Sequence, residues 1–284
     1  MIKRSLLGAI IVTAAGALAA CQSSPSETPP IGQFYAGDDG TESVGLFDQG
    51  FDQAVEDPAE TIFIIYNHGT YWGAGYEDCY PGTIPSFVRR WGEYGIDGRD
   101  VTVFYLCTQV TEKRFVLGRQ RSEENEALLD RLAALGVPRE HIFVFGHSGG
   151  ASAALLTAER AQEKFNAAVV SAPGYGFAYL EAEGESANWL DLEYDKWRSR
   201  LATADDMQAL VYVYDGDIIT PPAQALFLRD HPGVRMIQIQ APNDDGVLCK
   251  DEPEPHFYWW SACFKRDQVD VVEAYIKERL DLDS

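Results

Sequence analysis

Ser148 lies in a sequence setting that presents a hydroxyl group for nucleophilic attack. Residues 146–150 read G-H-S-G-G and match the pattern G-x-S-x-G. Strand formers precede this segment, and an alanine-rich, helix-forming stretch follows it. A strand that turns directly into a helix strains the backbone of the serine, and larger flanking side chains would collide, so we expect Gly146 and Gly150 to be required for steric reasons. The alternative is a plain glycine turn that Ser148 caps.

In this strand–turn–helix setting the segment resembles the nucleophile turn of the α/β-hydrolase superfamily. The resemblance extends from about residue 60 to about residue 280. It implies an α/β fold with a mostly parallel eight-stranded sheet flanked by helices and with a short lid insertion. It also implies a nucleophile, an acid and a base in the chain order Ser, Asp or Glu, His.

The loop after the expected strand 61–66 resembles the oxyanion loop of the same superfamily. The sequence there reads N-H-G-T over residues 67–70, and residues 68–73 fit H-G-x-x-x-G. Acyl transfer develops negative charge on a carbonyl oxygen, which preorganised N–H groups stabilise. By this resemblance the oxyanion donors are the backbone amides of Thr70 and Gly149, and His68 holds the loop. The alternative is a simple glycine turn.

The acid and the base follow from the same resemblance. An aspartate separated from a Pro by three residues follows the expected strand 210–214, which favours Asp217 over its rival Asp215. The base must follow the acid, and His256 lies in the loop after the last expected strand, whereas His231 precedes that strand and is expected to face solvent. The superfamily's G-x-G-H is absent here, because Pro253-Glu254-Pro255 precedes His256.

These residues predict a serine hydrolase with a triad of Ser148, Asp217 and His256. The imidazole takes the proton of the hydroxyl, the serine attacks a carbonyl carbon, and water releases the acyl enzyme. Hydrolysis of a small-molecule or polymeric carboxylic ester is the first expectation, and peptidase and thioesterase activities use the same groups. The alternative from another class is a non-catalytic binding protein of the cell envelope on a hydrolase scaffold.

The composition excludes some partners. The chain has 284 residues with 44 acidic and 23 basic side chains, for a formal net charge of −21. Such a surface repels nucleic acid and anionic headgroups, so no nucleic-acid partner is expected. No cofactor is expected either, and the cysteines lack the spacing of a metal site.

The N-terminal segment predicts export. A basic start and an apolar run from Leu6 to Ala20 form a signal peptide over residues 1–20, and L-A-A-C ending at Cys21 resembles a bacterial lipobox. This resemblance implies a lipidated Cys21 in the cell envelope. Gln22, rather than an aspartate, follows it, which favours the outer membrane, on its periplasmic side or at the surface. Residues 21–32 are expected to form a flexible tether and residues 33–284 a single domain.

The remaining cysteines are even in number, which in an exported protein indicates disulfide bonds. They are Cys79, Cys107, Cys249 and Cys263. Three pairings are possible, and we favour Cys79–Cys107 and Cys249–Cys263. The second pair would enclose His256 and help to fix its loop.

The rest of the chain alternates between strands and helices, which is typical of a parallel doubly wound sheet. Strands are expected at 61–66, 101–106, 142–145, 167–171, 210–214 and 235–240, after an N-terminal hairpin around residues 34–47. Helices are expected at 122–135, capped by Ser122, and at 269–280. Residues 174–206 fit a lid insertion, and the alternative is an ordinary packed helix. Aromatic side chains are expected around the site at positions 71, 72, 76, 80, 175, 177, 179 and 257–260. They could form a rim that contacts the substrate, and the alternative is that they pack the lid and the loops.

Overall fold

The computed structural model describes residues 31–36, 42–44, 55, 57–69, 83–107, 117–174, 185–240 and 254–280. For residues 31–36, 42–44, 107, 117 and 185–193 it describes the backbone alone. The signal peptide, Cys21 and most of the expected tether therefore lie outside the described residues, and β1 begins at Ile31, inside the range expected for the tether. No helix within the described ranges is long and apolar enough to cross a membrane.

The core of the fold is an eight-stranded sheet with the order β2-β1-β4-β3-β5-β6-β7-β8. Strand β1 is antiparallel to both of its neighbours, and the six strands from β4 to β8 in this order are parallel. The strands are β1 Ile31–Ala36, β2 Glu42–Val44, β3 Ile62–Asn67, β4 Val101–Cys107, β5 Ile142–His147, β6 Ala167–Ser171, β7 Ala209–Tyr214 and β8 Val234–Ile239.

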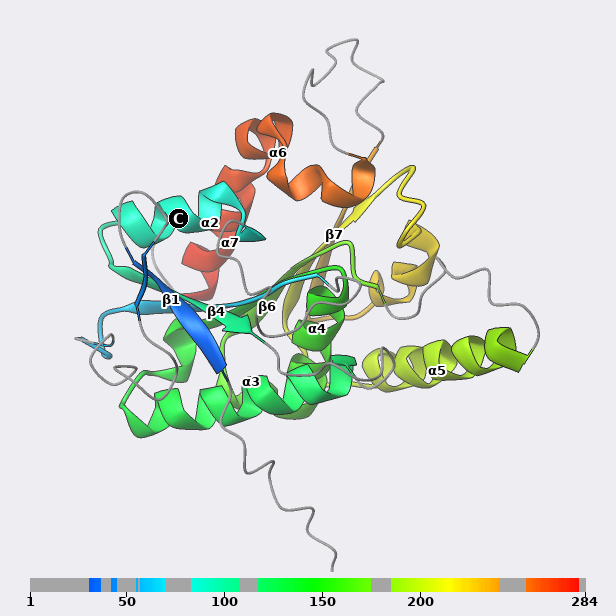
Figure 1. Cartoon of the computed structure of the whole chain (residues 1–284), viewed down its shortest axis with the longest axis horizontal. Coiled ribbons are helices and arrows are strands. Elements are labelled where there is room, and N and C mark those ends of the chain that lie inside the picture. The colour runs from blue at the N-terminus through cyan, green and yellow to red at the C-terminus, as the bar shows by residue number, and fades with distance from the viewer. Residues whose placement is uncertain are drawn as a thin grey trace, which may run out of the picture.

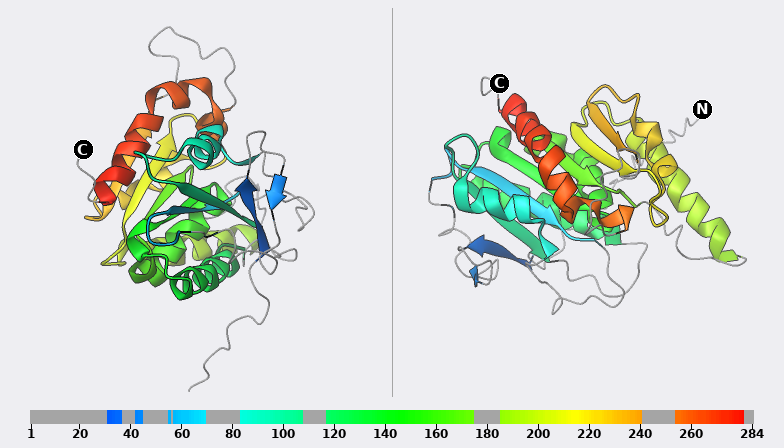
Figure 2. Two further views of the ribbon diagram at one scale, coloured as in Figure 1. Left: turned by 90° about the vertical axis from the view of Figure 1, so that its left-hand side faces the viewer. Right: turned by 90° about the horizontal axis from the view of Figure 1, so that it is seen from above.

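Helices cover both faces of this sheet (Figures 1 and 2). One layer contains α3 Leu117–Ala134, α4 Gly149–Ala161 and α5 Glu185–Ala202. The other contains α2 Ser86–Tyr94, α6 Ala262–Asp267 and α7 Val269–Arg279. Short 3-10 turns are η3 Arg139–His141, η4 Gln162–Lys164, η5 Pro222–Gln224, η6 Leu226–Leu228 and η7 Pro255–Trp260.

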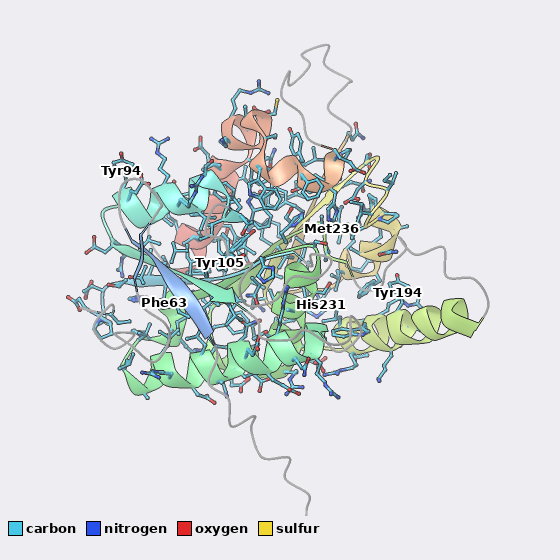
Figure 3. The ribbon with its side chains drawn as sticks, viewed as in Figure 1. Phe63, Tyr94, Tyr105, Tyr194, His231 and Met236 are labelled. Carbon is cyan, nitrogen blue, oxygen red and sulfur yellow. The ribbon has the colours of Figure 1, made fainter. Side chains whose placement is uncertain are left out.

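The central strands are apolar along their whole length because both of their faces are buried. In β3, Phe63 and Ile65 pack into the cluster under α3 and α4, while Ile64 and Tyr66 pack into the cluster under α2 and α7. Figure 3 shows Phe63 and, on the neighbouring strand, Tyr105 within the body of the molecule. A continuous apolar strand inside a parallel sheet is therefore confirmed.

Helix α5 follows β6 and extends away from the sheet (Figure 1). Its C-terminal half is fastened to the body, where Leu201 is fully buried. The hydroxyl of Tyr194, which is labelled in Figure 3, donates to the Gln224 carbonyl at 3.0 Å. Trp197 packs against the first turn of α3, since a Cβ on Gly118 would lie 2.9 Å from the Trp197 ring. The expected helix in the 174–206 insertion is thus present, while a lid role stays a prediction.

One helix prediction needs correction, and one helix was not predicted. Helix α3 begins at Leu117, so Ser122 does not cap it but lies fully buried inside it. Helix α2 was not predicted, although Phe87, Val88 and Trp91 form its buried face.

Candidate active site

The turn at Ser148 has the strained backbone that its sequence predicts. Strand β5 ends at His147 and α4 begins at Gly149, which leaves Ser148 with φ 52° and ψ −119°. Such a conformation costs on the order of 1–3 kcal/mol in a residue with a side chain. The Ser148 N–H donates to the Ser171 carbonyl at 3.0 Å, and the Gly174 N–H donates to the Ser148 carbonyl at 3.2 Å. These bonds to the end of β6 and to the segment after it hold the turn in place.

The two flanking glycines are required for steric reasons, as expected. A Cβ on Gly146 would overlap the backbone of Gly150. A Cβ on Gly150 would overlap the carbonyl groups of Asn67 and His68. The helix therefore packs directly against the end of β3, and this close approach brings the nucleophile turn and the oxyanion loop together.

Asp217 lies just beyond β7 and is held by four hydrogen bonds. Its Oδ1 accepts the N–H groups of Ile219 and Thr220, both at 2.8 Å. Its Oδ2 accepts the Thr220 hydroxyl at 2.8 Å and Nδ1 of His256 at 2.9 Å. Burial by itself raises the pKa of Asp217, but the hydrogen bond and charge of His256 and the bonds from Thr220 outweigh it and lower that pKa. The side chain is therefore a buried carboxylate.

His256 lies in η7, in the loop that follows β8, and its side chain is only 3% exposed. Because the Asp217 carboxylate accepts at Nδ1, the neutral ring carries its proton there and keeps a lone pair on Nε2. That is the tautomer a general base needs. The structure thus brings together two of the three predicted triad residues, which are 39 residues apart in the chain.

The two alternative candidates, Asp215 for the acid and His231 for the base, bond to other groups. Asp215 is partly exposed and accepts the side-chain amide of Gln238 at 2.6 Å. His231 lies ahead of β8, at the opposite edge of the sheet, as expected. It is buried rather than solvent-facing, however, because Nε2 bonds to the Ala204 carbonyl at 2.5 Å and Nδ1 accepts the Gly233 N–H at 3.2 Å.

Ser148 lies at the same edge of the sheet as this Asp–His pair, since it follows β5 and Asp217 follows β7. A Cβ on Gly174 would lie 3.7 Å from Ser148 Oγ and 2.9 Å from Cγ2 of Thr220. Gly174 therefore lies close to both Ser148 and Thr220, and the Thr220 hydroxyl contacts both Asp217 and His256. Among the described residues no hydrogen bond joins Ser148 to His256; catalytic bonds often tighten only when substrate binds.

The oxyanion loop is described only as far as Gly69, so the predicted donor Thr70 lies outside the described residues. Gly149 opens α4, where the first N–H groups have no partner within the helix. His68 is buried, and Nη1 of Arg121 donates to its carbonyl at 2.6 Å. Burial, with the charge of Arg121, holds the pKa of His68 well below its ordinary value, so this ring is neutral. Both observations fit its expected structural role.

Buried amides support the same loop from below. Asn67 and Asn125 exchange side-chain bonds at 3.1 and 3.3 Å, and Asn125 also donates to the Thr157 hydroxyl at 3.0 Å. They tie the end of β3 to α3 and α4. The sequence carries no clear signal for this network, because isolated asparagines read as turn residues.

Of the aromatic side chains expected around the site, the structure describes only residues 257–260, beside His256. The other seven lie outside the described residues. Tyr258 and Trp259 are buried in the core, which favours the packing alternative for these two. Phe257 remains 36% exposed, and its ring lies 5.1 Å from that of His256 and 6.1 Å from that of Trp260.

Cys263 is buried and disulfide-bonded. The side chains of the other four cysteines lie outside the described residues. The pairings Cys79–Cys107 and Cys249–Cys263 therefore remain predictions.

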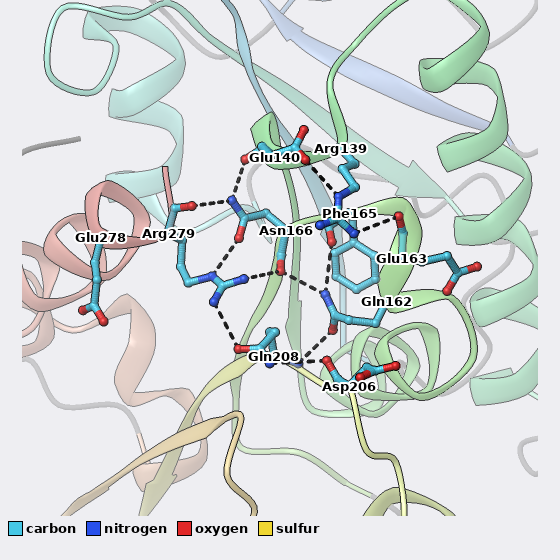
Figure 4. Close-up of a pocket in the computed structure, with 10 residues that line it drawn as sticks. All are labelled: Arg139, Glu140, Gln162, Glu163, Phe165, Asn166, Asp206, Gln208, Glu278 and Arg279. Atoms are coloured by element: carbon cyan, nitrogen blue, oxygen red, sulfur yellow. Dashed lines mark hydrogen bonds and ion pairs between the residues drawn. The ribbon is translucent and has the colours of Figure 1, made fainter. Parts of the chain in front are cut away.

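A separate hollow lies at the opposite edge of the sheet, ahead of β5, β6 and β7 (Figure 4). Asn166 donates to the carbonyls of Glu140 and Arg279, and the Arg279 guanidinium donates to the side chains of Asn166 and Gln208. These groups bond to one another and fasten the end of α7 to the sheet. We interpret this hollow as a structural junction.

The sheet order, its helical layers and the serine turn define an α/β fold of the α/β-hydrolase type. The chain is similar to the structure of DcsB in complex with its substrate analogue, with a TM-score of 0.56 and 14% identity over 88% of this chain and 95% of that one. The chain is also similar to a Mycobacterium tuberculosis puromycin-hydrolyzing peptidase, with a TM-score of 0.55 and 16% identity over 80% of this chain and 36% of that one. The similarity to a Pyrobaculum calidifontis esterase has a TM-score of 0.50 and 19% identity over 78% of each chain. No protein-family model matches the sequence, and neither does any curated protein.

Proposed function

We propose that this protein is a serine hydrolase that cleaves carboxylic esters through an acyl enzyme. The observation that carries the proposal is the buried Asp217–His256 pair at the sheet edge where the strained turn presents Ser148. Structural similarity to an esterase and to a peptidase is in keeping with it.

In this mechanism each residue of the proposed site has a defined task. Nε2 of His256 takes the Ser148 proton as Oγ bonds to the carbonyl carbon of the substrate. The Gly149 amide, with Thr70, stabilises the oxyanion. His256 then gives its proton to the leaving alcohol, and water repeats the sequence to release the acid. Asp217 holds the ring in its tautomer and stabilises the imidazolium.

The test is the replacement of Ser148 by alanine. We expect Ser148→Ala to lose hydrolysis of p-nitrophenyl acetate and butyrate by at least roughly 10³-fold, because the nucleophile is absent. It should also lose labelling by a fluorophosphonate probe, while its circular dichroism is unchanged. Activity equal to that of the wild type in folded Ser148→Ala would contradict the assignment of Ser148 as the nucleophile. Absence of labelling in the folded wild type would favour the binding protein instead.

Amide hydrolysis is the second candidate, and the similarity to a puromycin-hydrolyzing peptidase favours it. Ester and amide cleavage need the same triad and differ in the leaving group that His256 must protonate. A matched pair of substrates, an aminoacyl p-nitroanilide and the corresponding p-nitrophenyl ester, separates the two. A kcat/KM for the anilide close to that for the ester would favour the peptidase.

We also propose that the enzyme is anchored to the cell envelope through a lipidated Cys21, on the strength of the L-A-A-C segment alone. Stable anchoring needs at least two acyl chains, which a diacylated cysteine supplies. In a bacterial host, incorporation of labelled palmitate is expected for the full chain and not for Cys21→Ser. Equal incorporation in both would disprove this anchor.

A further inference from the structure

His147 is the last residue of β5 and directly precedes Ser148. The residue type at this place in G-x-S-x-G is free. In the structure its ring is buried, and Nε2 lies 2.8 Å from the backbone carbonyl oxygen of His256. A carbonyl can only accept, so Nε2 is the donor and the lone pair of the neutral ring is on Nδ1.

The other side of the ring faces the oxyanion loop. A Cβ on Gly69 would lie 3.1 Å from Nδ1 of His147, closer than most Cβ contacts, so the ring packs tightly against Gly69. The His147 ring also packs edge-on against His256 at 4.7 Å and against Trp260 at 4.6 Å between centroids. A single imidazole next to the nucleophile therefore fills the space between the oxyanion loop and the loop of the base.

This contact holds a part of His256 that Asp217 does not hold. Asp217 fixes the ring of His256 through Nδ1, whereas His147 fixes the backbone of the same residue through its carbonyl oxygen. The two bonds together define where Nε2 of His256 lies relative to Ser148.

We propose that His147 is a positioning residue, which sets the place of the general base relative to the nucleophile by holding the backbone of His256. The inference rests on the proposed hydrolase function. Burial and the charge of His256 lower the pKa of His147 to about 3, so its ring stays neutral and keeps this bond across the working pH range.

The experiment compares two substitutions. His147→Leu keeps the volume but has no donor, and we expect kcat for p-nitrophenyl acetate to fall by roughly 10²-fold with KM within about threefold, since small misplacements of catalytic groups cost about that much. His147→Gln offers an amide N–H at a similar reach and is expected to restore most of kcat. Fluorophosphonate labelling rates should follow kcat.

His231→Leu is the matched control, because His231 is also buried and also bonds a backbone carbonyl, but at the far edge of the sheet. We expect it to lower stability without changing kcat. An unchanged kcat in folded His147→Leu would overturn the proposal. So would a loss in His147→Gln as large as that in His147→Leu.

A readout independent of turnover separates this inference from the proposed function. The imidazole resonances of His256 in NMR spectra should be narrow in the wild type and in His147→Gln, and broadened in His147→Leu. If the wild type hydrolyses nothing, the hydrolase proposal fails while these spectra still decide the role of His147. Equal line widths in all three proteins would refute it.

Discussion

At the scale of single residues, the Asp217–His256 pair carries the chemistry. Both carboxylate oxygens of Asp217 accept two hydrogen bonds each, so the carboxylate is held in one orientation. Replacement by asparagine keeps the shape but allows the wrong imidazole tautomer, as an amide N–H can face Nδ1. We therefore expect Asp217→Asn to lower kcat by roughly 10²–10⁴-fold.

The chain offers a control for this prediction two residues away. Asp215→Asn removes a charge of the same kind at a partly exposed position bonded to Gln238. Its kcat for p-nitrophenyl esters is expected to match that of the wild type. If Asp215→Asn were the more damaging change, the acid would have been assigned to the wrong aspartate.

The same comparison shows what the sequence can predict about a site. Ser148, Asp217 and His256 were predicted because each lies at a fixed place relative to a strand. Thr220, Arg121 and His147 were missed as supporting residues, because their partners are backbone carbonyls or side chains that only the folded chain brings near. Such contacts leave no spacing in the sequence.

At the scale of elements, strands were predicted more closely than helices. Continuous apolar runs mark buried parallel strands, and β6 was predicted at its observed bounds. Helix α3 starts five residues earlier than its apparent cap at Ser122, because Trp197 of α5 packs on its first turn and Arg121 bonds to His68. Tertiary contacts thus overrode a local capping signal.

Helix α2 was missed for a different reason, because its helical spacing of apolar residues is present but short. Pro85 precedes it, and Gly95 ends it with φ 75°. Its buried residues Phe87, Val88 and Trp91 follow helical spacing. Nine residues give too little periodicity to stand out against the loops around them.

At the scale of the whole molecule, the sheet order explains why distant residues converge. Strands β3, β5, β6, β7 and β8 run parallel, so the residues that follow them meet at one edge. The fold buries several histidines close to that edge, two of them with lowered pKa values, His68 and His147. Buried neutral histidines link the stability of the fold to pH.

The sign of this link follows from the two states. An unfolded histidine binds a proton below about pH 6.5, whereas the buried ring of His147 stays neutral down to about pH 3. The unfolded state therefore binds more protons in this window, and the free energy of unfolding falls as the pH falls. Asp217, whose pKa is also lowered, adds a loss of the same sign at more acid pH.

We therefore expect the wild type to lose stability between pH 6.5 and pH 4.5, as measured by urea unfolding at constant ionic strength. In His147→Leu this decline should be shallower by about 1.4 kcal/mol per pH unit, the contribution of one proton. Ser148→Ala removes no titrating group and should keep the wild-type slope. An identical slope in His147→Leu would mean that this ring titrates alike in the folded and unfolded chains, which its burial against His256 argues against.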